Sequence, residues 1–61
     1  MARRMLTLAE LAQMLNVDPK VIYGLRYRRE GPPAIRCGRE LRFDPDDVDR
    51  WLASRKETAP P

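Results

Sequence analysis

Seven basic side chains lie between positions 19 and 42, where only two acidic residues, Glu30 and Glu40, oppose them. This stretch therefore carries a net charge of +5, in a chain whose total formal charge is +3. Each Lys or Arg held against a phosphate releases a condensed counterion, which favours binding to a polyanion. The basic residues are Lys20, Arg26, Arg28, Arg29, Arg36, Arg39 and Arg42. The stretch predicts a nucleic-acid partner.

Other chemistry finds little support in the residue types. The sequence has no histidine and a single cysteine, Cys37, so a Ser-His or Cys-His pair is impossible. Phosphate-cradling glycine loops and metal-ligand spacings are also missing from the sequence. The sequence also contains a possible carboxylate cluster, formed by Asp46, Asp47 and Asp49. In the first turns of a helix these carboxylates are explained by their favourable interaction with the positive end of the helix dipole. We expect no enzyme, no catalytic residue, no metal and no cofactor.

The length of 61 residues allows one small domain. A chain this short buries only roughly 60% of its unfolded surface, so its core is small. The lone cysteine rules out an intrachain disulfide and favours a reducing, cytoplasmic setting. Because no stretch approaches the ~20 apolar residues of a membrane span, we expect no association with a membrane. A monomer in solution is the expected state.

The first expected helix begins with a capping box, in which Thr7 is followed three residues later by Glu10. Leu6 precedes the cap and can pack against Leu11 in a hydrophobic staple. Apolar residues then recur at helical spacing as far as Leu15, which predicts one buried helix face.

A second helix begins almost at once, with Asp18 as its cap and Pro19 in its first turn. The break is so short that a tight helix-turn-helix is the expected geometry. Ile22 and Leu25 form the buried side, and Gly31-Pro32-Pro33 is expected to stop the helix. The opposite side carries Lys20, Tyr23, Gly24 and Tyr27, with Arg28 at its edge.

Alternation of apolar and basic residues then predicts a two-stranded hairpin around residues 38–40. One parity is apolar, comprising Ile35, Cys37, Leu41 and Phe43. The other parity carries Arg36 and Arg42, and Arg39 lies at the tip. Because a lone hairpin is unstable in water, the apolar side must rest on the helices. Cys37 is accordingly expected to be a small core residue of the hairpin.

Asp44-Pro45 repeats the helix-start signal, and the stripe Val48, Trp51 and Leu52 predicts a third buried helix face. Residues 43–61 hold three basic against five acidic residues, so this part is not expected to face a polyanion. The expected organisation is an arm over 1–5, one domain over 6–55 and a disordered tail over 56–61. The fold class is mainly α with a small β-hairpin, a winged helix-turn-helix.

This order of elements resembles the small excisionase and MerR-like winged-helix DNA-binding domains, over Leu6 to Leu52. The matching pieces are LTLAELAQMLNV, Tyr23 after Val21-Ile22, the turn Glu30-Gly31-Pro32-Pro33, the wing Ile35-Arg36-Cys37-Gly38-Arg39 with Leu41-Arg42-Phe43, and Asp47-Val48 before Trp51-Leu52. No single piece is specific, but all of them occur in order.

The resemblance implies double-stranded DNA as the partner, with the second helix in the major groove and the wing on the minor groove or backbone. The helix contacts would come from Lys20, Tyr23, Gly24, Tyr27 and Arg28. The wing contacts would come from Arg36, Arg39 and Arg42. Arg39 is the strongest single candidate, because a hairpin tip has little structural use for a long cation. Its alternative role is a solubilising turn residue.

Small members of this group are often recombination directionality factors. They bind side by side at phage or plasmid attachment sites, bend the DNA and steer a tyrosine integrase towards excision. The implied partners are thus a tyrosine integrase and further copies of the chain on DNA, in the nucleoid of a bacterial cell. Transcription regulation at promoters is an alternative, and so is an adaptor whose basic side binds an acidic protein.

Two residues depart from the family pattern. Gly24 stands where many relatives carry a larger polar residue, and it either permits close approach to DNA or only weakens the helix. Arg26 stands where relatives often place an aromatic or aliphatic residue, and its role stays open. The long dimerisation helix and effector domain of MerR regulators are missing from the sequence, so no small-molecule effector is expected.

Overall fold

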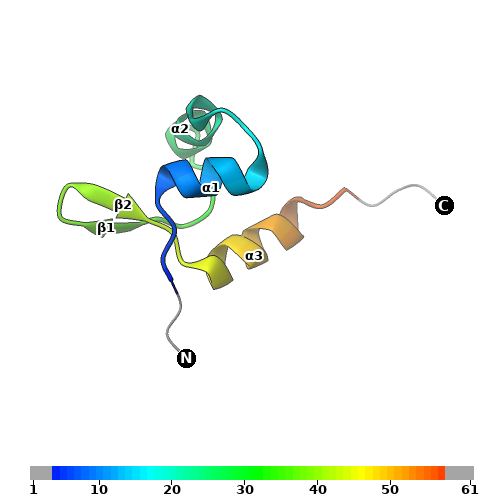
Figure 1. Ribbon diagram of the computed structural model, residues 1–61. Coiled ribbons are helices and arrows are strands. Elements are labelled where there is room, and N and C mark those ends of the chain that lie inside the picture. The colour runs from blue at the N-terminus through cyan, green and yellow to red at the C-terminus, as the bar shows by residue number, and fades with distance from the viewer. Residues whose placement is uncertain (1–3, 58–61) are drawn as a thin grey trace.

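The computed structural model describes residues 4–57 and contains the predicted winged helix-turn-helix. Its elements are α1 (Leu8–Leu15), α2 (Pro19–Tyr27), β1 (Ile35–Cys37), β2 (Glu40–Arg42) and α3 (Pro45–Arg55). Helices α1 and α2 lie together, the hairpin extends to one side of them and α3 to the other (Figure 1). The first three residues of the expected arm and the last four of the expected tail lie outside the described residues. No helix within residues 4–57 is long and apolar enough to cross a membrane.

All three helices begin at the predicted caps. The Thr7 hydroxyl accepts a hydrogen bond from the Glu10 amide at 3.0 Å, and the Glu10 carboxylate accepts one from the Thr7 amide at 2.9 Å. Asp18 and Asp44 each accept a hydrogen bond from the amide two residues further on, at 2.9 Å. These bonds satisfy amides that the helices themselves leave without a partner, which fixes where each helix begins.

The capping box makes one contribution to stability depend on pH. The pKa of Glu10 lies below its ordinary value of 4.5, first because the Thr7 amide donates to the carboxylate and also because the Arg4 guanidinium lies 2.9 Å away. A lowered pKa means that ionised Glu10 stabilises the fold above pH 4.5, and that this contribution is lost as the pH falls through the lowered pKa.

Glu10→Gln keeps the acceptor of the capping box and removes only the charge. We predict that the native protein is more stable than this variant at neutral pH, and that the difference shrinks well below pH 4.5. Urea unfolding of both proteins across this range measures the difference. A gap of the same size at every pH would show that the charge of Glu10 contributes nothing.

Helices α1 and α2 end in the same way, with one residue in the left-handed conformation. Asn16 and Arg29 both have φ of 58°. After α1, the Val17 amide donates to the Ala12 carbonyl at 3.0 Å, and the corresponding bond after α2 joins residues 30 and 25 at 2.8 Å. This is the Schellman pattern, which satisfies the last helix carbonyls. Helix α2 therefore stops before the predicted terminator, Gly31-Pro32-Pro33.

The core gathers side chains from all three helices, from β2 and from the segments that flank them. Leu11, Ile22, Phe43 and Val48 are fully buried, and Ala12 is nearly so. The predicted buried sides of the first two helices are confirmed, and Phe43 is the largest side chain in the core.

Trp51 is only half-buried, so the predicted apolar stripe of α3 is fully buried at Val48 alone. The Trp51 indole donates a hydrogen bond of 2.8 Å to the Glu30 carbonyl, in the turn after α2. This bond joins two elements that are 21 residues apart in the sequence and gives the indole N–H its partner.

The predicted two sides of the wing are wrong. Cys37 pairs with Glu40 and Ile35 with Arg42, because the turn has two residues, Gly38-Arg39, where the sequence suggested three. Gly38 has φ of 64°, which L-residues rarely adopt and which suits a tight hairpin turn. Shifting a strand by one residue moves every side chain to the other side of the sheet.

The shifted register separates residues that were expected on one side. Leu41 now lies opposite Arg36 and packs against the core, together with the neighbouring Phe43. Ile35 is 42% exposed and Cys37 is exposed, so the expectation that Cys37 is a core residue is also wrong. Arg42 lies on the same face of the hairpin as Ile35, and Arg36 lies on the opposite face.

A short β-bridge anchors the base of the wing. The Leu6 amide donates to the Phe43 carbonyl at 2.9 Å, and the Phe43 amide donates to the Leu6 carbonyl at 2.8 Å. The bridge holds the end of the wing beside the start of α1. Nothing in the local sequence pattern predicted it.

Candidate nucleic-acid interface

The outer side of α2 presents the predicted side chains to solvent. Tyr23 is 60% exposed and Tyr27 is 90% exposed, and Lys20 is exposed beside them. Tyrosine is enriched at binding interfaces because it combines an apolar ring with a hydroxyl, and that hydroxyl can donate to a phosphate. The arrangement suits a helix that enters the major groove, although contact with DNA stays a prediction.

Arg28 lies just beyond the last turn of α2, where the sequence placed it at the edge of the exposed side. Its guanidinium pairs with Glu30 at 3.3 Å. The same guanidinium lies 3.4 Å from the position that a Cβ on Gly24 would occupy. That is an ordinary van der Waals contact with the end of a flexible side chain, so a methyl group fits at position 24.

Gly24→Ala is therefore expected to stabilise the protein by about 1 kcal/mol, the difference in helix propensity between the two residues. Thermal or urea unfolding measures this change. DNA affinity of the same variant decides between the two roles of Gly24. Weaker binding of the more stable variant would show that the glycine permits close approach to DNA, and unchanged binding would show that it only weakens the helix.

The three wing arginines differ in how strongly they are held. Arg42 donates to the Leu41 carbonyl at 2.8 Å and to the Glu40 carboxylate at 3.0 Å. Arg36 and Arg39 are exposed, and neither forms an ion pair with a carboxylate among residues 4–57. Arg36 and Arg39 are thus the wing cations that are free to bind an external anion.

An open groove separates α2 from the wing, and we call it the α2–wing groove. It has a volume of about 390 Å³ and is lined by Thr7, Leu8, Tyr23, Arg36, Arg39, Glu40, Leu41 and Arg42. The groove brings together one predicted helix residue and all three predicted wing arginines. Lys20, Tyr27 and Arg28 do not line it.

The start of α1 also lines the α2–wing groove, through Thr7 and Leu8. Sequence patterns had not placed Thr7 and Leu8 at the interface. The capping box could have indicated them, because it places the positive end of a helix dipole at this point. Backbone amides at a helix start are suited to binding phosphate.

Negative charge gathers on α3 instead. Asp46 and Asp47 lie in its first turn, Asp49 is exposed, and Asp47 forms an ion pair with Arg50. Figure 1 shows that α3 begins beside the base of the hairpin and extends away from it, so its acidic first turn lies apart from α2 and from the tip of the wing. A polyanion would approach from the end that carries α2 and the wing.

The chain matches the family model of the helix-turn-helix domain over residues 5–56. It belongs to this family, which includes excisionase-like DNA-binding proteins. The protein is therefore a DNA-binding helix-turn-helix protein, and its helices and hairpin have the arrangement of the winged class. A search of curated proteins found no matching relative.

Proposed function

We propose that this protein is a recombination directionality factor of the excisionase type. It binds attachment-site DNA in a sequence-specific manner, bends that DNA and directs a tyrosine integrase towards excision. It is not an enzyme and acts in the cytoplasm on the nucleoid of a bacterial or phage-infected cell. The observation that carries the proposal is that almost all of residues 4–57 serves one winged helix-turn-helix, with its excess positive charge on α2 and the wing.

The proposed contacts use two elements at once. Helix α2 lies in the major groove, where Tyr23 and Tyr27 contact thymine methyl groups or phosphates, and Lys20 and Arg28 contact the backbone. The wing crosses the adjacent minor groove or backbone, with Arg39 at its tip and Arg36 in the α2–wing groove. A protein that holds DNA at two neighbouring grooves can stabilise a bend, because the additional contacts offset the energy of deforming the duplex.

Cooperative binding requires contact between neighbouring copies on DNA. The wing extends sideways from the helices (Figure 1), and its outer side exposes Ile35 and Cys37. Both are uncharged side chains on a strand that the core does not cover. We propose that this side of the wing meets the next protomer when several copies bind side by side.

Sequencing of the DNA fragments that the purified protein retains from its source genome, at near-physiological salt, tests this function. Closely spaced repeats beside an integrase gene would support the directionality factor. Enrichment at promoters alone would instead indicate a transcriptional regulator with the same contacts. Retention of no fragment, together with salt-insensitive binding to an acidic protein, would favour an adaptor and contradict the proposal.

The matched control for this capture is the protein with Arg36→Ala and Arg39→Ala. Both side chains are exposed and neither is in an ion pair with a described residue, so their removal leaves the fold intact. Fragments that the control retains equally well are held without the two wing arginines or through contaminants, and they are subtracted from the enriched set.

A further inference from the structure

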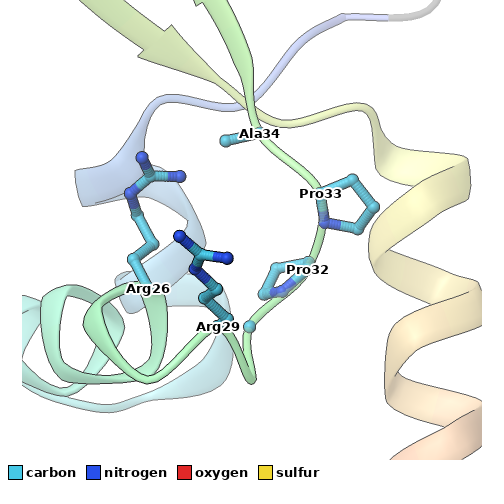
Figure 2. A pocket seen from close by; sticks show the side chains of 6 residues that line it. Arg26, Arg29, Pro32, Pro33 and Ala34 are labelled. Carbon is cyan, nitrogen blue, oxygen red and sulfur yellow. The ribbon is translucent and has the colours of Figure 1, made fainter.

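A second open pocket lies between the end of α2 and the segment that leads into β1, and we call it the turn pocket. Its volume is about 390 Å³, and it is lined by Arg26, Arg29, Gly31, Pro32, Pro33 and Ala34. Figure 2 shows the side chains of Arg26 and Arg29 rising side by side into the opening, with Pro32, Pro33 and Ala34 on the other side. Neither arginine was assigned a contact in the interface described above.

The two guanidinium groups have no counter-charge within the described part of the chain. Neither Arg26 nor Arg29 forms an ion pair with a carboxylate among residues 4–57, and the nearest acidic residue in the sequence, Glu30, pairs with Arg28. Two like charges that line one pocket repel each other, and a bound anion removes this repulsion. A planar guanidinium also binds the oxygens of a phosphate in a bidentate manner.

The backbone at Arg29 supports a role in binding. Arg29 occupies the left-handed position of the Schellman turn, with φ of 58°, and its amide donates to the Arg26 carbonyl at 3.0 Å. Glycine or asparagine ends a helix in this way with less strain, as Asn16 does after α1. A strained arginine points to a use for its side chain at this place. Pro32, which is buried, fixes the opposite wall.

The turn pocket and the α2–wing groove are lined by neighbouring parts of the chain. Arg26 lies three residues after Tyr23, so the two side chains are neighbours on the same side of α2. Ala34 directly precedes β1, whose next residues include Arg36. Tyr23 and Arg36 both line the α2–wing groove, and Arg26 and Ala34 both line the turn pocket. The two hollows thus share their flanking elements, α2 and the segment that includes β1.

We propose that Arg26 and Arg29 bind a phosphodiester group of the DNA strand that passes between α2 and the wing. The inference rests on the proposed binding of DNA. It adds a site that contacts the DNA backbone and does not recognise the base sequence. A phosphate fixed by two arginines sets the register of α2 along the major groove. Arg26, whose role the sequence left open, then has a function.

The test compares the double variant Arg26→Ala/Arg29→Ala with a control of equal charge, Arg50→Ala/Lys56→Ala, whose side chains lie on or beside α3. Fluorescence anisotropy with duplexes of several sequences gives the affinity at a series of salt concentrations. The loss of two phosphate contacts makes the negative slope of log K against log salt shallower by about two. The loss of affinity is uniform across the sequences, and the control keeps the slope of the native protein.

Arg29→Gly separates binding from folding. Glycine adopts the left-handed conformation without strain, so this variant has a raised melting temperature and yet binds DNA more weakly than the native protein. Arg26→Lys/Arg29→Lys keeps the charges and retains most of the salt slope. A more stable Arg29→Gly variant with undiminished affinity would overturn the inference.

Failure of the inference is distinguishable from failure of the proposed function. If the native protein binds duplexes and the Arg26→Ala/Arg29→Ala variant has the same slope and affinity, only the phosphate site is overturned. The same variant losing affinity for an acidic protein, but not for DNA, would assign the pocket to a carboxylate. If the native protein binds no duplex at any salt concentration, the proposed function and the phosphate site both fail.

Discussion

Replacing both Arg36 and Arg39 by alanine is expected to weaken DNA binding roughly a hundredfold at moderate salt, from about 3 kcal/mol for two lost charged hydrogen bonds. Both side chains are exposed, and neither is neutralised by a carboxylate of the described chain. Their charge is therefore available to phosphates. The slope of log K against log salt is negative, and its magnitude decreases by about two as the two counterion-releasing contacts disappear.

Anisotropy titrations over a series of salt concentrations measure both effects. Arg42→Ala is the matched control within the wing, because the Arg42 guanidinium is already held by the Leu41 carbonyl and the Glu40 carboxylate. The replacement of Arg42 is expected to change the DNA affinity and the salt slope less than the replacement of either exposed arginine, Arg36 or Arg39. If the Arg36→Ala/Arg39→Ala double variant and the Arg42→Ala variant both bind as the native protein does, the wing does not contact DNA.

Replacing Phe43 by alanine is expected to remove a large part of the free energy of unfolding of the protein. Phe43 is fully buried at the centre of the core, and large-to-small changes at such positions cost about 3 to 5 kcal/mol. A domain of 61 residues has a free energy of unfolding of only about 3 to 9 kcal/mol. The cavity left by the ring therefore removes between about a third and all of the free energy of unfolding.

Circular dichroism and urea unfolding of Phe43→Ala test this expectation. Ile35→Ala is the control, because Ile35 is an apolar residue of the same hairpin that is 42% exposed and lies outside the core. Its replacement should cost clearly less than that of Phe43, since Ile35 already exposes 42% of its surface. A Phe43→Ala variant that unfolds at nearly the urea concentration of the control would contradict the position of Phe43 in the core.

Local signals predicted the helices well because their boundaries depend on neighbouring residues. The capping box of Thr7 and Glu10, and the Asp-Pro starts at Asp18 and Asp44, each form hydrogen bonds within three residues of the cap. The spacing of apolar residues likewise identified the buried and exposed sides of α2. Both kinds of signal are complete within one or two helical turns.

The wing shows where such reasoning fails. Alternation in the sequence gives the parity of each strand, but the relation between the strands depends on the number of residues in the turn. A two-residue turn with Gly38 at positive φ placed Cys37 in solvent and Leu41 against the core. The bridge between Leu6 and Phe43 joins residues far apart in the sequence, and no local pattern specifies it.

The candidate interface was predicted only where it depends on local sequence patterns. The exposure of Tyr23 and Tyr27 follows from helix periodicity alone. The presence of Arg26 and Arg29 in the lining of one pocket depends on the left-handed conformation of the residue at position 29, after the helix. Sequence patterns favour Gly or Asn at such a position, so an arginine there gives no signal.

The most direct test of the DNA interface is an NMR titration of the isotope-labelled protein with a short mixed-sequence duplex at low salt. The account predicts that the largest changes in amide and arginine side-chain signals occur in α2, in the turn after it and in the wing. The exposed residues of α3, such as Asp49, should change little. Changes concentrated on α3, or no changes at any DNA concentration, would contradict it.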